Sequence, residues 1–203
     1  MFLSLDGIDG AGKSTQLALL AAWLRTTGRD IVTCRDPGST PLGDAIRRIL
    51  LDAHDVPITR TAEMLLYMAA RAQLVNDVIR PALEAGQIVI SDRYLLANVV
   101  YQGHAGGLDI KELWRIGQTA TGRLEPNLTI VLDMPPEAAT TRLARPLDRM
   151  ERQGDEFRHR LRQGFLAEAS RRPEQIVVID AARPIEAVKA DIFRAVEERL
   201  SSS

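Results

Sequence analysis

The sequence is poor in the features that mark several large classes of protein. Its one cysteine, Cys34, excludes an internal disulfide and is typical of a protein from a reducing cytoplasm. No apolar run comes near the roughly 18 residues needed to cross a bilayer, and the first residues carry neither the basic nor the apolar part of a secretory signal. The sequence therefore predicts a cytoplasmic protein that has no membrane as a partner.

The chain also has no large excess of positive or negative charge. The formal net charge is -1, which gives no reason to expect bulk nucleic acid as a partner. Lysine is scarce among the 26 basic residues, since Lys13, Lys111 and Lys189 are the three lysines and the other 23 are arginines. One of these three lysines falls inside a glycine-rich segment near the start of the chain, which makes that segment the first candidate for a site.

Five short apolar runs recur at wide spacing, at residues 1–5, 30–34, 87–91, 128–132 and 175–179. Each has the length of a strand and little alternation, which is typical of strands buried on both faces of a parallel sheet. Helical spacing fills the gaps at residues 14–28, at 60–86, where Pro81 predicts a kink or restart, and at 184–200. The alternation predicts an α/β fold with a parallel sheet and helices on both faces. No linker divides residues 1–203, so we expect one domain with a lid at about residues 142–155.

The segment "GIDGAGKST" fits the pattern G-x-x-x-x-G-K-[ST], between a predicted strand and a predicted helix. Glycines let the backbone N–H groups wrap around phosphates, and the following helix adds its positive end. Lys13 would reach the β- and γ-phosphates, and Ser14 would bind Mg²⁺. An ordinary glycine-rich turn is the alternative. The expected ATP-binding residues are Gly7, Ile8, Asp9, Gly10, Ala11, Gly12, Lys13, Ser14 and Thr15.

Two carboxylate–arginine pairs follow predicted strands. Asp92 comes after an apolar strand, where a carboxylate can hold the water shell of Mg²⁺, and Arg93 beside it offers a forked cation for a phosphate. Arg35 and Asp36 form the second pair, before a Pro-Gly turn. An ordinary surface pair is an equally good reading of either one alone. Together, at the carboxyl ends of neighbouring parallel strands, they predict a crevice that grips two phosphates. The expected Mg²⁺ ligands, partly through water, are Ser14, Asp92 and Asp36.

These motifs, with "MLLYMAARAQL", "SDRY" followed by "YQG", and the closing arginine-rich segment, resemble thymidylate kinase in order from residue 3 to about 199. The resemblance implies phosphorylation of dTMP to dTDP with ATP and Mg²⁺, a transfer whose acceptor is itself a phosphate group. It also implies a three-layer P-loop kinase fold with a five-stranded parallel sheet and a small arginine-rich lid. A homodimer is the implied assembly.

The resemblance also implies roles for single residues in the acceptor site. Asp9 would hydrogen-bond the sugar 3'-hydroxyl of dTMP, and Tyr67 would stack on thymine while Arg71, four residues on and on the same helical face, reaches its carbonyl oxygen. Tyr101 would crowd the 2' position against ribonucleotides. From the residues alone, Tyr67 could equally belong to the core. The implied dTMP-binding residues are Asp9, Arg35, Tyr67, Arg71, Arg93, Asn98, Tyr101 and Gln102.

Four arginines, Arg142, Arg145, Arg149 and Arg152, are spaced for one helical face, although Pro146 interrupts it. A solvated charged face explains such a run in most proteins. Relatives with an arginine inside the phosphate loop need no catalytic arginine in the lid, and this chain has Gly10 at that loop position. The resemblance therefore implies that Arg145 or Arg149 stabilises the transition state. The expected catalytic residues are Lys13, Arg93, Arg145 and Arg149.

Two other functions remain open from the sequence. Another nucleoside monophosphate kinase or a deoxynucleoside kinase on the same fold is the first alternative, although a deoxynucleoside kinase needs a carboxylate base near the sugar 5'-hydroxyl and little grip on an acceptor phosphate. A nucleotide-sensing P-loop switch, which binds ATP without phosphorylating a small acceptor, is the second. Intact Lys13, Asp92 and Arg93 speak against that switch.

Overall fold

A computed structural model describes residues 1–52, 57–142 and 153–201. All five expected strands are present, as β1 (Phe2–Asp6), β2 (Ile31–Arg35), β3 (Ile88–Asp92), β4 (Leu128–Asp133) and β5 (Ile176–Asp180). They form one parallel sheet in the order β2-β3-β1-β4-β5. The fold expected from the apolar runs is confirmed. Four strands begin one residue later than the runs that predicted them, and β4 begins at the same residue as its run.

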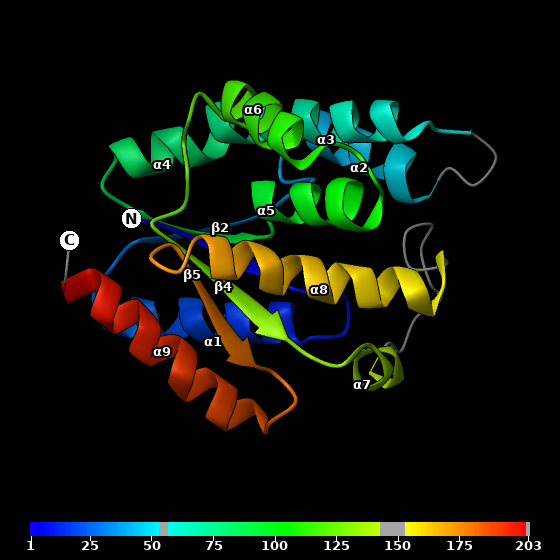
Figure 1. Cartoon of the computed structure of the whole chain (residues 1–203). Coiled ribbons are helices and arrows are strands. Elements are labelled where there is room, and N and C mark those ends of the chain that lie inside the picture. The colour runs from blue at the N-terminus through cyan, green and yellow to red at the C-terminus, as the bar shows by residue number, and fades with distance from the viewer. Residues whose placement is uncertain (53–56, 143–152, 202–203) are drawn as a thin grey trace.

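Burial explains why the strands read as unbroken apolar runs. The central strands β1 and β3 are buried at nearly every position, whereas the edge strand β2 has exposed residues. Helices cover both faces, so neither face of a central strand meets water. Helices α1 (Lys13–Thr26) and α9 (Ile185–Ser201) lie below the sheet in Figure 1, and α3 (Arg60–Leu74), α6 (Ile110–Thr121) and α8 (Asp155–Arg171) lie above it.

The remaining elements complete the upper layer and its margins. Helix α2 (Pro41–Leu51) packs against α3, and α7 (Pro136–Thr141) packs against α8. The short helix α5 (Leu95–Asn98) continues into the π-helical segment η2 (Val99–Ala105), which packs against α8 and α6. The loops that leave the carboxyl ends of the strands open toward one edge of the sheet, which is where parallel sheets bind ligands.

The helix expected at residues 60–86 shows how the chain accommodates Pro81. Helix α3 passes into the π-helical segment η1 (Val75–Ile79) and then into α4 (Arg80–Glu84). A proline has no N–H group and its ring crowds the carbonyl four residues earlier. The wider π turn directly before Pro81 relieves that crowding, so a change of helical pitch takes the place of a sharp break.

Helix α1 begins without a side-chain cap. Its N-cap is Gly12, at φ 90°, with no side-chain hydrogen bond. Ser14 and Thr15 belong to the first turn and are exposed. Gly28, the last residue of the segment with helical spacing, has φ 76° and follows the last helical residue by two positions. The uncapped first turn leaves backbone N–H groups directed at the mouth of the sheet.

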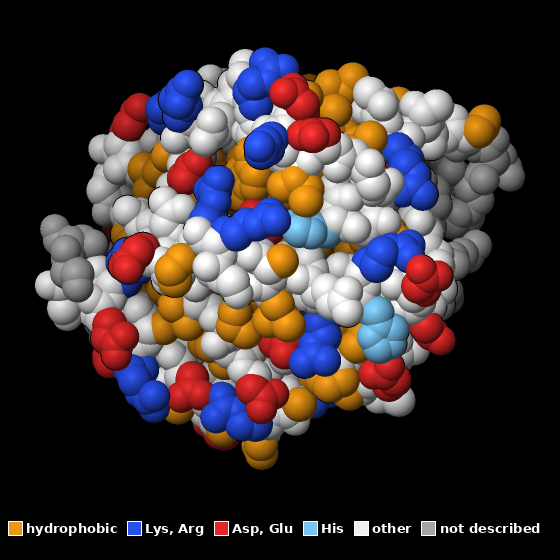
Figure 2. Space-filling view, in the orientation of Figure 1, with side chains coloured by type: hydrophobic (Ala, Val, Ile, Leu, Met, Phe, Trp, Pro, Cys, Tyr) orange, Lys and Arg blue, Asp and Glu red, His pale blue; other side chains and the backbone are white. Residues whose placement is uncertain are grey.

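Charge is dispersed over the face shown in Figure 2, where acidic and basic side chains alternate and apolar ones lie between them. No helix in the described ranges is both long and apolar enough to span a bilayer. The expected lid falls mainly on residues 143–152, outside the described part of the chain, and the organisation as one domain with a lid stays a prediction.

Candidate active site

The phosphate loop connects β1 to α1 and curls around the side chain of Lys13. The Lys13 ammonium group donates to the carbonyl oxygens of Gly7 (3.1 Å) and Ile8 (2.9 Å), and it lies 3.5 Å from Asp9 Oδ1. Gly7 and Gly10 hold φ values of 132° and 87°, which favour glycine. A Cβ on Gly10 would lie 2.2 Å from the Ala139 carbonyl oxygen, so the loop lies tightly against α7.

A cavity of about 720 Å³ opens over this loop. Its floor is the loop from Asp9 onward and the first turn of α1, including Ser14 and Thr15. Gly7 and Ile8 are not among its lining residues, because they lie beneath the loop, where their carbonyls hold Lys13. Uncapped N–H groups at the end of a 14-residue helix make this floor a site for anions.

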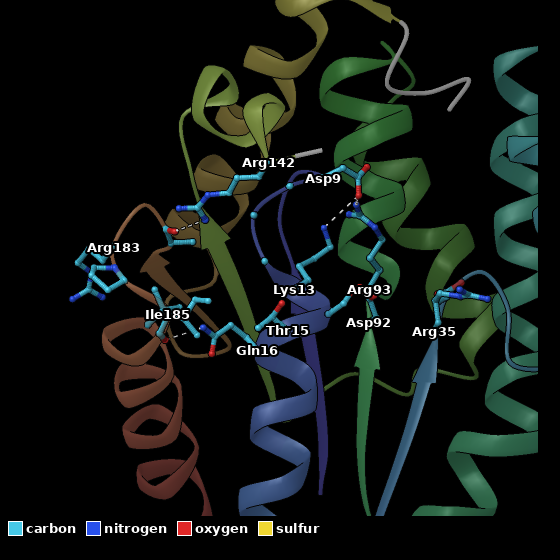
Figure 3. Close-up of a pocket in the computed structure, with 18 of the residues that line it drawn as sticks. Asp9, Lys13, Thr15, Gln16, Arg35, Asp92, Arg93, Arg142, Arg183 and Ile185 are labelled. Atoms are coloured by element: carbon cyan, nitrogen blue, oxygen red, sulfur yellow. Dashed lines mark hydrogen bonds and ion pairs between the residues drawn. The ribbon is translucent and has the colours of Figure 1, made fainter. Parts of the chain in front are cut away.

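The far end of this cavity involves residues that sequence reasoning missed. The loop from β5 to α9 supplies Arg183, and α9 begins at Ile185. Gln16, from α1, donates through its Nε2 to the Ile185 carbonyl (3.0 Å) (Figure 3). Arg142, one of the four expected lid arginines, directly follows α7 and lines the same end, where its guanidinium donates to the Ala181 carbonyl (3.3 Å). No motif marks Arg183 or Ile185, and they reach the cavity because β5 is a neighbour of β4 in the sheet.

Arg93 stands where β3 ends, facing the phosphate loop from the other side (Figure 3). Its Nη1 donates to the Gly7 carbonyl (2.9 Å) and its Nη2 to Asp9 Oδ1 (2.6 Å) and to the Tyr101 hydroxyl (3.2 Å). Tyr101 in turn donates to Asp9 Oδ2 (3.2 Å). The pairing of Leu5 in β1 with Asp92 in β3 brings these residues together, although they lie more than 80 positions apart in sequence. Arg93 has a φ of 69°, an uncommon conformation for a residue with a side chain.

Burial and nearby charge act against each other at this point. Burial opposes the charge on Arg93, but the carboxylates of Asp9, Asp92 and Asp6 hold its pKa above the ordinary value for arginine. Burial and the neighbouring Arg93 lower the pKa of Lys13. Burial raises the pKa of Asp6 to about 6, although a hydrogen bond from the Ser4 hydroxyl opposes that rise. The site therefore concentrates cations behind a loop of N–H groups, an arrangement that suits a polyanion.

A second, smaller pocket of about 80 Å³ adjoins the first. Tyr67, Arg71, Asn98, Tyr101 and Gln102 line it, so the structure brings together the residues expected to contact a nucleobase and its sugar. The two pockets share four lining residues, which are Asp9, Asp36, Arg47 and Arg93. Two cations and two carboxylates therefore mark the junction of the pockets.

Asp36 and Arg71 form a buried ion pair at this junction. Arg71 Nε donates to Asp36 Oδ2 at 2.5 Å, and the two side chains are 2% and 0% exposed. The sequence grouped Asp36 with its neighbour Arg35 at the end of a strand, and both line the large cavity, but the ion-pair partner of Asp36 is Arg71. Successive residues at a strand end point to opposite sides, so Arg35 turns outward, lies half exposed 3.8 Å from Asp44, and lines the large cavity instead of the small pocket.

One residue that lines the small pocket and one that lies behind it had no signal in the sequence. Arg47, from α2, lines both pockets and donates to the Pro37 carbonyl (3.1 Å), and burial lowers its pKa. Glu63, from the first turn of α3, is 5% exposed and accepts a hydrogen bond from Gln102 (2.8 Å). Each comes from an ordinary amphipathic helix, in which a lone charge reads as a surface residue.

The expected Mg²⁺ ligands lie at the large cavity. Asp92 and Ser14 line it, and Asp92 Oδ1 is buried without a partner among the described residues. No cluster of three or more metal-binding side chains occurs within the described ranges. Mg²⁺ commonly takes one or two carboxylates and completes its shell with water and phosphate oxygens, so an unpartnered carboxylate oxygen beside a phosphate loop fits this ion. Asp36 is committed to Arg71 through Oδ2, and its Oδ1 is the oxygen left for a ligand.

Of the lid arginines, Arg142 lines the large cavity, whereas Arg145, Arg149 and Arg152 lie outside the described residues. Their expected roles stay predictions.

Known proteins resemble this chain over nearly its whole length. The family model described as thymidylate kinase matches residues 5–192. The thymidylate kinase of Symbiobacterium thermophilum is 46% identical over 201 residues, which cover 98% of this chain and 94% of that protein. That of Deinococcus radiodurans is 45% identical over 201 residues, covering 98% and 97%. The crystal structure of thymidylate kinase from Ehrlichia chaffeensis superposes with a TM-score of 0.79 at 27% identity, covering 97% of this chain and 98% of that one.

Proposed function

Because the chain belongs to the thymidylate kinase family, and so phosphorylates dTMP with a nucleotide donor, we propose that its two adjoining pockets hold the two substrates end to end. ATP would lie in the large cavity over the phosphate loop, and dTMP in the small pocket beside α3. This placement is supported by the residues that line both pockets. Two of them, Arg93 and Arg47, lie where the γ-phosphate of ATP and the phosphate of dTMP would meet.

On the donor side, the N–H groups of the loop and of the first turn of α1 would bind the β- and γ-phosphates. Lys13 now donates to the loop's own carbonyls, and we propose that it exchanges these contacts for phosphate oxygens when ATP binds. The cavity extends past Gln16 to Arg142 and Ile185, which leaves room for the nucleoside of ATP between α7 and the β5–α9 loop.

On the acceptor side, Tyr67 would stack on thymine, Arg71 would donate to a carbonyl of the base, and Arg93 would bind the phosphate. Arg71 Nη2 supports this role, because among the described residues its nearest acceptor is the distant Tyr94 carbonyl (3.5 Å). Asp9 would bind the sugar hydroxyl, since Arg93 and Tyr101 hold its carboxylate at the junction. Arg35 is the least supported member of this set because it lines the donor cavity.

The chemistry needs alignment and neutralised charge more than a general base, since the acceptor oxygen is already anionic. Arg93 would hold the acceptor phosphate in line with the γ-phosphate, and Arg145 or Arg149 would cover the transferring group. Ser14 and Asp92, with Asp36 through water, would hold Mg²⁺, which neutralises the β- and γ-oxygens when bound.

Steady-state kinetics tests the placement. With ATP and Mg²⁺, we expect ADP release to be much faster with dTMP than with dUMP, UMP, CMP, AMP or thymidine. Tyr67→Leu should raise the KM for dTMP about tenfold and leave the KM for ATP within about twofold, because a stacked ring contributes roughly 1–2 kcal/mol. Equal changes in both KM values would contradict the end-to-end placement, and a preference for thymidine would favour a deoxynucleoside kinase.

The lid assignment has its own test. Arg145→Ala or Arg149→Ala should lower kcat by about 10³-fold with a smaller change in KM, as loss of a transition-state cation does. Arg160→Ala is the matched control, because Arg160 is a half-exposed arginine of α8 that pairs with Glu156. Near-normal turnover in both single variants and in the double variant would refute the assignment.

We also propose a cytoplasmic homodimer. Leu42 and Ile49, one heptad apart on α2, and Leu65 on the adjoining α3 are 48%, 43% and 51% exposed. Exposed apolar side chains on two packed helices suit a contact with a second copy of the chain. Sedimentation should give a dimer that Leu65→Lys shifts toward monomer, and a wild-type monomer at micromolar concentration would exclude this assembly.

A further inference from the structure

A chain of hydrogen bonds runs from Arg71 to Glu63 along the small pocket. Arg71 Nη1 donates to Asn98 Oδ1 (3.0 Å), Asn98 Nδ2 donates to Gln102 Oε1 (2.6 Å), and Gln102 Nε2 donates to Glu63 Oε1 (2.8 Å). All four side chains are buried, with exposed fractions between 1% and 5%. Three of them line the small pocket, and Glu63 does not.

The two ends of this chain determine the direction of every hydrogen bond within it. A guanidinium can only donate, and an ionised carboxylate can only accept. Asn98 must therefore turn its oxygen toward Arg71 and its NH₂ group toward Gln102, and Gln102 must turn its NH₂ group toward Glu63. Buried amides rarely leave a donor or acceptor unpaired, so the arrangement excludes a flipped amide at either position.

Glu63 accepts the last hydrogen bond of this series from outside the small pocket. It lines a separate cavity of about 310 Å³, together with Arg60, Gln153 and Phe157, and among the described residues that cavity shares only Tyr101 and Gln102 with the small pocket. Gln102 is thus part of a wall between the two spaces, with its oxygen on the Arg71 side and its NH₂ group on the Glu63 side. Glu63 would not touch a nucleotide in the small pocket.

The fixed directions of these hydrogen bonds suit a thymine base and do not suit a cytosine base. Thymine offers an acceptor at O4 and a donor at N3–H, whereas cytosine offers a donor amine at C4 and an acceptor at N3. Arg71, as a donor beside the second lone pair of Asn98 Oδ1, is complementary to thymine. If Gln102 turned over, its NH₂ group would face the NH₂ group of Asn98, and an Asn98 that turned in response would present NH₂ hydrogens where an N3–H group needs an acceptor, which removes that complementarity.

We propose that Glu63 is a positioning residue that fixes the orientation of Gln102 and Asn98, and thereby the selectivity of the enzyme for thymine over cytosine. This inference rests on the proposed placement of dTMP in the small pocket. Glu63 acts through Gln102, so it affects binding of the acceptor nucleotide and leaves the donor site unchanged.

Two substitutions of Glu63 separate this role from simple packing. Glu63→Met keeps the length of the side chain and removes the acceptor, whereas Glu63→Gln keeps an acceptor oxygen for Gln102. We expect Glu63→Met to raise the KM for dTMP about tenfold, with kcat within about threefold and the KM for ATP within about twofold, because a hydrogen bond to a charged group is lost. Calorimetry should show the ratio of the dissociation constants for dCMP and dTMP falling about tenfold. Glu63→Gln should stay within about twofold of the wild type on each measure.

Arg60→Gln is the matched structural control. Arg60 lies one turn before Glu63 on α3, lines the same cavity, and donates to the Gly106 carbonyl after η2, so it also ties α3 to η2. We expect this variant to change the melting temperature without changing the KM for dTMP. If Glu63→Met does not fold, the double variant with Gln102→Met takes its place and is compared with Gln102→Met alone, because both lack the acceptor for Asn98 Nδ2 and differ only at Glu63. Adding Glu63→Met to Gln102→Met should then have no further effect on the KM.

The outcomes distinguish this inference from the proposed function. Arg71→Met should raise the KM for dTMP as well, since Arg71 would contact the base directly. If Arg71→Met leaves the KM unchanged, the placement of dTMP is wrong. Suppose instead that Arg71→Met raises the KM for dTMP. The positioning role of Glu63 is then refuted if Glu63→Met leaves both this KM and the ratio of the dCMP and dTMP dissociation constants at wild-type values. It is also refuted if Glu63→Gln changes these values as much as Glu63→Met does.

Discussion

Replacing Arg71 by methionine would leave the buried carboxylate of Asp36 without its ion-pair partner. The side chains are 2% and 0% exposed and 2.5 Å apart, and Asp36 Oδ1 already lacks a partner among the described residues. Removing one member of a buried pair typically costs about 3–5 kcal/mol, because the remaining charge stays desolvated. Two charges about 4 Å apart at an effective dielectric constant of about 20 interact by a similar amount, about 4 kcal/mol. We therefore expect Arg71→Met to lower the free energy of unfolding by about 4 kcal/mol at pH 7.5.

The loss should depend on pH with a definite sign. Burial raises the pKa of the Asp36 carboxyl, and Arg71 opposes that rise, so removing Arg71 raises this pKa further. The folded variant then binds a proton where the unfolded chain does not, and its stability increases as pH falls. Urea unfolding at pH 7.5 and 5.5 should show the gap to the wild type narrowing at the lower pH.

Two further variants complete the measurement. Arg71→Met combined with Asp36→Leu should recover at least half of the lost stability, because an apolar pair carries no desolvated charge. Arg35→Met, which removes an exposed arginine 3.8 Å from Asp44, should cost less than about 1 kcal/mol. A loss below about 1 kcal/mol in Arg71→Met would show that the ion pair contributes little to stability. A gap that does not change with pH would contradict the expected rise in the pKa of Asp36.

Two further predictions concern the phosphate loop and the far side of the sheet. Gly10→Ala should abolish most turnover and lower stability by about 1–3 kcal/mol, because φ is 87° and the new Cβ would lie 2.2 Å from the Ala139 carbonyl oxygen. Gly86→Ala is the control, because Gly86 has φ 76° and a Cβ there would meet nothing within 4 Å. It should lower stability by about 1 kcal/mol in thermal unfolding and leave kcat unchanged. If the two variants had equal effects, the clash of Gly10→Ala with Ala139 would be excluded as the cause. Glu168 is 1% exposed, and although burial opposes its charge, hydrogen bonds from His104, Trp114 and Arg171 lower its pKa. Glu168→Gln should therefore cost about 2–3 kcal/mol above pH 4.5, its ordinary pKa, and the difference should vanish as pH falls through the folded-state pKa. A constant difference across that range would contradict the assignment of this pKa.

The fold was predictable because its signals are local. A strand such as β3 is apolar at three of its four buried positions, and the phosphate loop carries its glycines within nine residues, so each can be recognised without knowing its neighbours in space. The helix that contains Pro81 was harder, because a proline predicts a kink or restart but does not indicate the π turn that the structure has at Val75–Ile79. Asp36 shows the same limit at the site: its neighbour in sequence is Arg35, but its partner in space is Arg71.

The sequence by itself determined the class of fold and the phosphate loop, since periodicity and short motifs are properties of contiguous chain, and its resemblance to a family implied the residues expected to contact dTMP. Only the tertiary structure decided which charges pair, that Arg47 belongs to both pockets, and that Glu63 closes the hydrogen-bond chain from Arg71. These contacts depend on the sheet order and on how helices pack across it. The physical reason is that burial makes a polar side chain take whichever partner is in reach, and that partner is set by the fold and not by distance along the sequence.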